Sequence, residues 1–362
     1  MVTLRAALPS RAAPWLAAIG TVAAGCRPVA PPVTVPVDPS PLRPAVITER
    51  VRHDSDDPAI WIDRRQRERS LVLGTDKHEE GALYAFDLQG RVVRQVDGLK
   101  RPNNVDVEYD VALGGRRVDL AAVTERLGDT LRFFTLPDFT PIDGGGIPIF
   151  EGESDRAPMG VALYKRPRDG ATFAMVSRKS GPREGYLWQY RLGGAADRVQ
   201  LTRVRAFGAF SGSGEIEAVA VDDALGYVYY SDESTGVRKY HADPDAPDAA
   251  RELAVFATSG FAEDREGISI YETARRRGYI LVSDQQANRF QIFRREGRRE
   301  DPHDHALLRV VVTSAIESDG SEVTSVPLGS RFPQGLFVAM SEGGVFHFYS
   351  WPDVAGGLSG RN

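Results

Sequence analysis

Cysteine, histidine and helical periodicity are scarce in this chain, and each scarcity excludes a class of fold or chemistry. The 362 residues contain one cysteine, Cys26, so intrachain disulfides are excluded and the rest of the chain has no thiol nucleophile. The six histidines form no zinc-binding pattern, and the one close pair, His303 and His305, lies in a predicted exposed turn. The motifs of zinc proteases, serine hydrolases and histidine acid phosphatases are also missing. Covalent and zinc-dependent catalysis are therefore disfavoured, which leaves metal-activated water as a nucleophile.

An excess of either charge is lacking as well. Lysine and arginine number 45 and aspartate and glutamate 50, which gives a net charge of −5. Nucleic-acid-binding proteins usually carry a basic surplus, so we expect no nucleic-acid partner. An anionic ligand is still compatible with this balance, because bound divalent cations can reverse the local field.

The first 44 residues are typical of targeting and linking segments. Residues 1–25 combine Arg5 and Arg11 with a short apolar stretch, as in a signal peptide. Small residues lead into Cys26, as in the lipobox of bacterial lipoproteins; the alternative is an ordinary signal peptide with an incidental cysteine. Residues 26–44 are proline-rich and predict an extended tether. We expect an extracytoplasmic protein: a lipoprotein held on a bacterial membrane through Cys26, or otherwise a secreted or periplasmic protein.

Residues 45–352 alternate β-branched and aromatic runs with turn residues, which predicts an all-β domain. Six similar segments recur about 45–60 residues apart, a period that suits blades of about four antiparallel strands. The sequence therefore predicts a six-bladed β-propeller, and the alternative is an open array of β-sandwich sheets. The expected innermost strands are residues 57–62, 104–109, 159–164, 217–222, 266–271 and 322–326.

Two terminal segments complete this prediction. We expect residues 46–51 to add a strand to the last blade and close the ring, and residues 353–362 to form a tail. A closed ring leaves no exposed sheet edge, so we expect a monomer.

Most of the six segments carry an acid at or near their start. In a propeller the innermost strands surround the axis, so their leading side chains converge at one mouth of the channel. Carboxylates gathered there cannot all stay ionised without cations, and oxygen ligands in a roomy site favour Ca²⁺. The alternative is that each acid merely caps a strand or faces solvent. The predicted ring consists of Asp56, Asp57, Asp106, Glu217, Glu266 and Glu322.

Three basic residues, Lys77, Arg126 and Lys179, each follow the second or third strand of a unit and are expected near the same mouth. Arginine offers a planar fork of donors and lysine a point charge. Cations beside a calcium-loaded acidic ring suit a multiply charged anion such as phosphate.

These segments resemble the β-propeller phytases over about residues 46–351. The most specific pieces are Asp56-Asp57-Pro58-Ala59-Ile60-Trp61, Asn103-Asn104-Val105-Asp106 with Tyr109, Glu217 with Asp222-Asp223, Glu266-Gly267-Ile268-Ser269-Ile270-Tyr271, and Phe332-Pro333-Gln334-Gly335-Leu336-Phe337-Val338.

The resemblance implies a calcium-dependent, 3-phytase-like phosphoric monoester hydrolase. Several calcium ions at the channel mouth would hold the phosphates of phytate or another inositol phosphate and activate a water for in-line attack. By position, the calcium ligands would be Asp56, Asp57, Glu217, Glu233, Glu266, Glu49, Glu317 and Asp319. A neighbouring, more structural calcium would be held by Asn104 and Asp106. The phosphate-binding residues would be Lys77, Arg126 and Lys179, which with Asp57, Glu217 and Glu266 make up the implied catalytic set.

Three positions depart from the pattern of this family. Met159 replaces a tyrosine that contacts phosphate, and Glu125 replaces a neutral polar residue before Arg126. The loop 317–320 is short, and an acid that normally follows the last core strand is displaced to Glu342. We expect these changes to affect rate, substrate preference and calcium stoichiometry rather than the fold.

Two other functions remain open. One is another calcium-dependent propeller hydrolase, of the lactonase or phosphotriesterase type, which would need fewer cations around the metal than Lys77, Arg126 and Lys179 provide. The other is a non-catalytic, surface-tethered calcium propeller that binds a ligand, with Met159 as a sign of lost activity.

Overall fold

The computed structural model describes residues 1, 3, 35, 37, 40–273 and 276–358 of the chain. The predicted signal peptide, residues 1–25, and Cys26, the predicted site of lipid attachment, lie outside the described residues, apart from Met1 and Thr3. No helix in these described ranges is long and apolar enough to cross a membrane.

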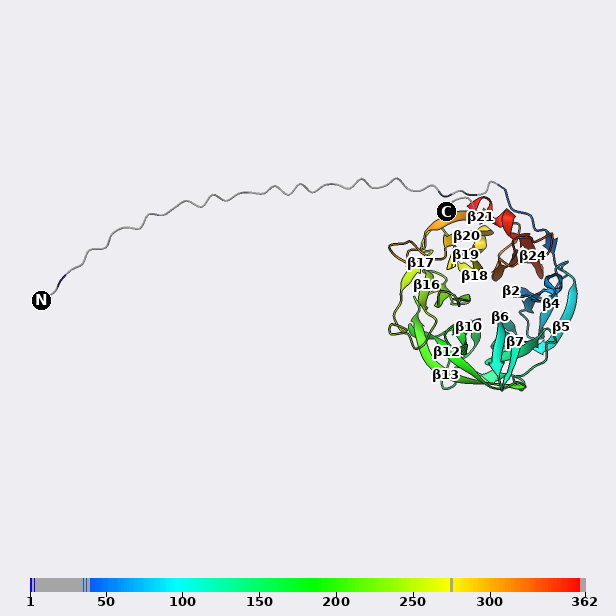
Figure 1. Cartoon of the computed structure of the whole chain (residues 1–362), viewed down its shortest axis with the longest axis horizontal. Helices are drawn as coiled ribbons and strands as arrows, with labels where there is room; N and C mark the ends of the chain where they lie inside the picture. Colours follow the sequence, from blue (N-terminus) through cyan, green and yellow to red (C-terminus); the bar gives the residue numbers. More distant parts are fainter. Residues whose placement is uncertain (2, 4–34, 36, 38–39, 274–275, 359–362) are drawn as a thin grey trace. The chain divides into compact units, whose positions relative to one another are not determined.

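The all-β, six-bladed propeller is confirmed: six antiparallel sheets of four strands are arranged in a ring (Figure 1). Each blade begins with the strand nearest the axis. In chain order, the first five blades are β2 (Ser55–Trp61), β3 (Leu71–Asp76), β4 (Gly81–Phe86) and β5 (Val92–Leu99); β6 (Pro102–Leu113), β7 (Arg116–Glu125), β8 (Thr130–Leu136) and β9 (Ile147–Pro148); β10 (Pro158–Lys165), β11 (Thr172–Arg178), β12 (Glu184–Ala195) and β13 (Arg198–Ala209); β14 (Val219–Asp222), β15 (Tyr227–Asp232), β16 (Gly236–His241) and β17 (Ala254–Phe256); and β18 (Arg265–Glu272), β19 (Gly278–Asp284), β20 (Arg289–Arg294) and β21 (Leu307–Val312).

The sixth blade closes the ring, as the sequence predicts. It consists of β22 (Ser321–Thr324), β23 (Leu336–Ser341), β24 (Val345–Ser350) and the N-terminal β1 (Val46–Ile47), which pairs antiparallel with β24. Because β1 comes from the start of the domain and β22 from its end, the two ends of the chain are joined within one sheet. The first strands contact their neighbours around the ring, including β22 with β2.

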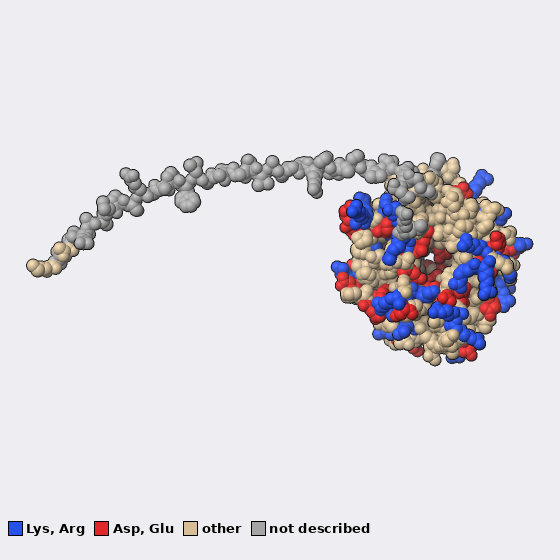
Figure 2. Space-filling model, viewed as in Figure 1, with Lys and Arg blue, Asp and Glu red and all other residues tan. Residues whose placement is uncertain are grey.

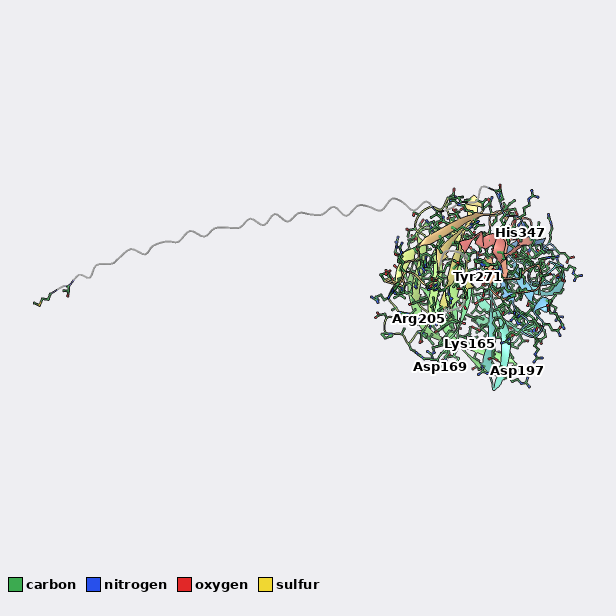
Figure 3. The ribbon with its side chains drawn as sticks, turned by 45° about the horizontal axis from the view of Figure 1, so that its top comes forward. Lys165, Asp169, Asp197, Arg205, Tyr271 and His347 are labelled. Atoms are coloured by element: carbon green, nitrogen blue, oxygen red, sulfur yellow. The ribbon has the colours of Figure 1, made fainter. Side chains whose placement is uncertain are left out.

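The core of the propeller lies between the blades. Six buried hydrophobic clusters are present in the described residues, and each one combines side chains of two neighbouring blades. This follows from the sequence, because the middle strands of the blades are largely apolar and largely buried, and β4 (GALYAF) is buried along its whole length. The face-to-face packing of sheets fixes the first strands around the axis. Tyr271 of β18 lies near the centre of the ring, whereas Asp197, in the β12–β13 turn, lies at its edge (Figure 3).

Both predicted terminal segments contain residues that contact the propeller. Leu42, within the predicted tether, donates its N–H to Val312 O (2.8 Å) and accepts a hydrogen bond from Ser314 N (3.1 Å). Folded contacts therefore begin before residue 45. The helix α1 (Trp351–Ala355) starts at the end of the predicted propeller, and Val354 and Ala355 in the predicted tail are buried.

Candidate metal and phosphate site

The candidate site is built on β-bulges at the start of the first strands. In β2, Ser55 pairs with Asp76 and Pro58 with Gly74, so Asp56 and Asp57 together face the single residue Thr75. β6, β10 and β18 have the same bulge, in which two residues face one residue of the second strand. A bulge re-aims its side chains, which here brings them toward the axis.

The register makes six residues equivalent, one in each blade. In blades four and six no residue before the bulge is paired with the second strand. Val219 and Ser321 are nevertheless equivalent to Pro58, because each pairs with the residue that lies two positions before the end of the second strand. Counting back two residues from these positions gives the ring in every blade. The ring residues, in blade order, are Asp56, Asn103, Met159, Glu217, Glu266 and Asp319.

This register corrects the predicted ring in two blades. Asn103 and Asp319 occupy the positions that the sequence interpretation gave to Asp106 and Glu322. Asp106 and Glu322 instead line a cavity of about 330 Å³ within the channel, together with Asp57. The interpretation counted along each strand and so could not see the extra residue that the bulge inserts.

A hydroxyl group faces the bulge in each of the first five blades and ties it to the next blade. Thr75 Oγ1 accepts a hydrogen bond from Asp57 N (3.0 Å) and donates to Asn103 O (2.6 Å). Thr124 does the same with Asn104 N (2.9 Å) and Met159 O (2.7 Å). The other three hydroxyls belong to Ser177, Ser231 and Ser283. This chain of hydrogen bonds holds neighbouring bulges in a fixed relation.

The ring residue is followed by glycine in three blades, at Gly160, Gly267 and Gly320, and this allows the first strands to approach closely. A Cβ at Gly160 would lie 1.9 Å from Glu217 O, and one at Gly320 would lie 2.4 Å from Asp57 Oδ1. Any larger side chain would therefore displace the backbone or the carboxylate of a neighbouring blade.

Blades four, five and six form an acidic half of the mouth. Glu215, Glu217 and Glu233 place carboxylate oxygens within 4.8 Å of one another. Burial, followed by the charge of Glu217, raises the pKa of Glu233 to about 8. Burial also raises the pKa of Glu266 well above its usual value, with Glu217 and Glu233 adding to the effect. Glu266 Oε2 is buried and has no hydrogen-bond partner among the described residues.

Lys77 connects this acidic half to blade one. Its Nζ lies 2.5 Å from Asp56 Oδ1 and 3.0 Å from Asp319 Oδ2. Burial acts to lower the pKa of Lys77, but the carboxylates of Asp56 and Asp319 raise it overall, so the side chain is a cation. Asp56 is buried, and apart from the contact of Oδ1 with Lys77 its carboxylate has no hydrogen-bond partner in the described part of the chain.

Blades two and three form a cationic half. Arg126 and Lys179 follow β7 and β11 at the corner position that Lys77 takes after β3. Lys179 Nζ is paired with Glu215 Oε1. The ring residues of these blades, Asn103 and Met159, carry no charge, and Asn103 Nδ2 donates to Glu217 Oε1. One face of the propeller shows carboxylates in the central hollow with basic side chains around it (Figure 2).

A family model described as Phytase matches residues 43–346. The chain belongs to the phytase family.

One similar protein is the 3-phytase of Bacillus subtilis (strain 168). It is 26% identical over 318 residues, and the match covers 83% of this chain and 80% of the relative. The protein is therefore a phosphoric monoester hydrolase of the 3-phytase type. Membership of the family also implies metal dependence in general, and the carboxylates of Glu215, Glu217 and Glu233 are a candidate place for the metal.

Two solved structures are distantly similar to this chain. The structure of the Dos1 propeller is 10% identical, covers 82% of this chain and 68% of its own, and has a TM-score of 0.43. The crystal structure of the mitotic checkpoint complex is 10% identical, covers 89% and 96%, and has a TM-score of 0.48.

The structure does not bring two of the predicted calcium ligands to the phytase site. Glu49 is exposed, and its Oε2 accepts a hydrogen bond from Val92 N (2.7 Å) on the outermost strand of blade one. Glu317 is exposed at the surface, and its N–H donates to Asn288 Oδ1 (2.8 Å). No contact found in the described residues joins either side chain to the acidic half.

Asn104 and Asp106, predicted to hold a more structural calcium, lie deeper in the channel. Asp106 Oδ2 accepts a hydrogen bond from Leu163 N (2.6 Å), and burial raises the pKa of Asp106 to about 7. Burial also raises the pKa of Asp57 well above its usual value. The channel group is thus separate from the mouth group, although Asp57 adjoins both.

The three departures from the family have visible structural settings. Met159 is buried in the ring, where its carbonyl accepts the hydrogen bond from Thr124. Glu125 is buried and paired with Arg132, and its Oε1 accepts a hydrogen bond from Lys100 N (2.8 Å). Glu342 takes the corner position after β23. Glu125 is therefore used inside the blade and does not neutralise Arg126.

The sequence interpretation missed two members of the site, Glu215 and Asn103. A signal for them was available in the repeated corner, in which a hydroxyl residue and a polar residue end the second strand and the corner side chain follows. These corners are Thr75-Asp76-Lys77, Thr124-Glu125-Arg126, Ser177-Arg178-Lys179, Ser231-Asp232-Glu233 and Ser283-Asp284-Gln285. Aligning the corners instead of the first strands gives the correct register.

Proposed function

We propose that this phytase is calcium-dependent and hydrolyses phosphate monoesters of phytate or other inositol phosphates. The observation that carries the proposal is the division of the mouth into an acidic half and a cationic half. A substrate phosphate at their boundary would meet bound cations on one side and basic side chains on the other.

The donor set fits calcium rather than a transition metal. All of the candidate ligands at the mouth are carboxylates, and no histidine or cysteine is among them. Buried carboxylate oxygens without partners, on Asp56 and Glu266, would be costly unless a proton or a cation satisfied them. The residues that would hold calcium are Asp56, Asp57, Glu217, Glu233, Glu266 and Asp319, with Glu215 added.

The side chains of this chain divide the remaining work. Bound calcium would supply neutralisation of substrate charge and a lowered pKa for an attacking water. Asn103 fixes the direction of the Glu217 carboxylate by its hydrogen bond. Lys77 keeps Asp56 and Asp319 in place as a fixed cation. Arg126 and Lys179 offer donors to phosphate oxygens, and Lys179 must exchange its bond to Glu215 to do so.

The test is phosphate release from phytate by residues 26–362 carrying Cys26→Ser, with millimolar calcium and with excess EDTA. We expect release only with calcium, and Glu217→Gln to lower it by at least about a hundredfold. Glu68→Gln, on an exposed 3-10 turn (η1, Arg67–Arg69), is the matched control and should behave as the parent. If calcium stabilises the protein against heat but no phosphomonoester releases phosphate, the protein is a ligand-binding calcium propeller and not an enzyme. Release that survives EDTA would remove calcium dependence.

We also propose that the propeller is tethered outside the cytoplasm through a lipid on Cys26, with the proline-rich segment as spacer. The support is the sequence alone: a signal-like segment, the single cysteine and the prolines that follow. Detergent partitioning of the full chain and of its Cys26→Ser variant decides this point, since equal solubility of the two proteins would exclude the lipid.

A further inference from the structure

Arg101 occupies a rim position at the mouth that no family pattern or sequence motif assigned. It lies directly before β6 and is half-buried, with φ at 58°, a conformation that costs energy for a non-glycine residue. Its N–H donates to His78 O (2.8 Å), and its carbonyl accepts a hydrogen bond from Arg126 N (3.0 Å). Arg101 is thus fixed between the corners of blades one and two.

We call the residue whose carbonyl accepts a hydrogen bond from the N–H of the corner residue the rim residue. Other blades have the same hydrogen bond. Lys77 N donates to Asp54 O, Glu233 N to Glu215 O, and Gln285 N to Asp264 O. Asp54, Glu215 and Asp264, in blades one, four and five, are acids, whereas Ala157 and Ile316 take the same position in blades three and six and carry no charge. In blade two the rim residue is a cation, so Arg101 extends the cationic half of the mouth.

The four basic residues at the mouth differ in their partners. Lys77 is paired with Asp56 and Asp319, and Lys179 with Glu215. Arg101 and Arg126 have no ion pair or side-chain hydrogen bond with any described residue. Burial, followed by the charge of Arg101, lowers the pKa of Arg126, so the two guanidinium groups repel each other. Two adjacent unpaired arginines favour an anion that binds between them.

Glu125 supports this arrangement without neutralising it. Its Oε1 accepts the N–H of Lys100, and Leu127 N donates to Lys100 O (3.1 Å), which holds the residue before Arg101. The second oxygen, Glu125 Oε2, accepts a hydrogen bond from the hydroxyl of Thr130 (2.8 Å), and Arg132 forms an ion pair with Oε1 (3.4 Å). The carboxylate is therefore occupied within blade two, and the charge of Arg101 stays available at the mouth.

We propose that Arg101 is a fourth phosphate-binding cation, which together with Arg126 holds one phosphate group of the substrate without a metal ion. This deepens the proposed phytase function and rests on it for the identity of the substrate. Arg101 also supplies hydrogen-bond donors in the half of the ring where Met159 offers none. A substrate with several phosphates gains from the pair, whereas a monophosphate held by the metal half alone gains little.

The experiment compares three variants of the calcium-loaded protein: Arg101→Gln, Arg101→Lys and the control Arg116→Gln. Arg116 is exposed and begins β7 at the end opposite Arg126, so it matches the charge change within the same blade. Binding of myo-inositol hexasulfate, measured by calorimetry, needs no turnover. KM and kcat are measured for phytate and for 4-nitrophenyl phosphate, and melting temperatures show that each variant is folded.

We expect Arg101→Gln to weaken hexasulfate binding and raise the phytate KM by about tenfold, with kcat and the 4-nitrophenyl phosphate kinetics within about twofold. Arg101→Lys should be intermediate, because it keeps the charge but loses the planar fork. Unchanged hexasulfate binding in Arg101→Gln, or an equal loss in Arg116→Gln, overturns the proposal. If hexasulfate binding depends on Arg101 but the parent releases no phosphate, the anion pair stands and the phytase function fails. If the parent releases phosphate normally but hexasulfate binding does not depend on Arg101, the phytase function stands and the proposed role of Arg101 fails.

Discussion

At the scale of single residues, the site depends on which side chain a bulge directs to the axis. The sequence was sufficient to find Asp56, Glu217 and Glu266, because each acid directly precedes a recognisable strand. It placed Asp106 and Glu322 in the ring instead of Asn103 and Asp319. An inserted residue shifts the side chains by one position, and a comparison of the first strands alone does not reveal this shift, whereas the hydrogen bonds across to Thr75 and Thr124 do.

Gly160→Ala tests how tightly the bulges are packed. The added Cβ would lie 1.9 Å from Glu217 O, so the backbone of Glu217 must move and its carboxylate with it. We expect a loss of phosphate release of at least tenfold, weaker calcium binding and a lower melting temperature. The control is Gly193→Ala in the β12–β13 hairpin, where a Cβ meets no atom within 4 Å and should be neutral. Equal behaviour of the two variants would contradict a tight contact at Gly160.

At the scale of elements, the blade repeat could be predicted because six first strands with similar residues recur along the chain. The closing strand was also predicted, but residues 46–51 shorten to β1, Val46–Ile47. Beyond Ile47 the contacts become irregular: Thr48 N donates to Phe346 O (3.0 Å), and Thr48 Oγ1 accepts from Phe346 N (2.9 Å). Here the side chain of Thr48 takes the place of a backbone carbonyl as the hydrogen-bond acceptor. The β-propensity of the sequence does not predict such a substitution.

Removing β1 should open the ring. A protein that begins at Glu49 loses the bonds of Ala45, Val46, Ile47 and Thr48 to β24, which leaves that strand as an exposed edge. We expect a loss of several kcal/mol in the free energy of unfolding and a tendency to aggregate, measured by denaturant unfolding and light scattering. A protein that begins at Val35 keeps these bonds and is the control. Identical midpoints for the two proteins would show that β1 does not contribute to closure.

At the scale of the whole molecule, the acidic half concentrates carboxylates whose charge opposes folding unless cations bind. Glu233, with its pKa raised to about 8, and Glu266, raised well above its usual value, hold protons in the folded protein that they release when unfolded. Between pH 4.5 and 8 the folded state therefore binds more protons than the unfolded state. It follows that the free energy of unfolding of the calcium-free protein falls as pH rises through about 4.5 to 8.

Calcium should reverse this trend, because it replaces the protons as the partner of the ionised carboxylates. We expect the gain in melting temperature from millimolar calcium over EDTA to be larger at pH 8 than at pH 5.5, with protons released on binding. Glu266→Gln removes one unpartnered acid, so its calcium-free form should be more stable than the parent at pH 8 and gain less from calcium. Glu68→Gln should follow the parent at both pH values. A calcium gain that does not change with pH would mean that these carboxylates are already ionised without the metal, and the electrostatic basis of the acidic half would have to be abandoned.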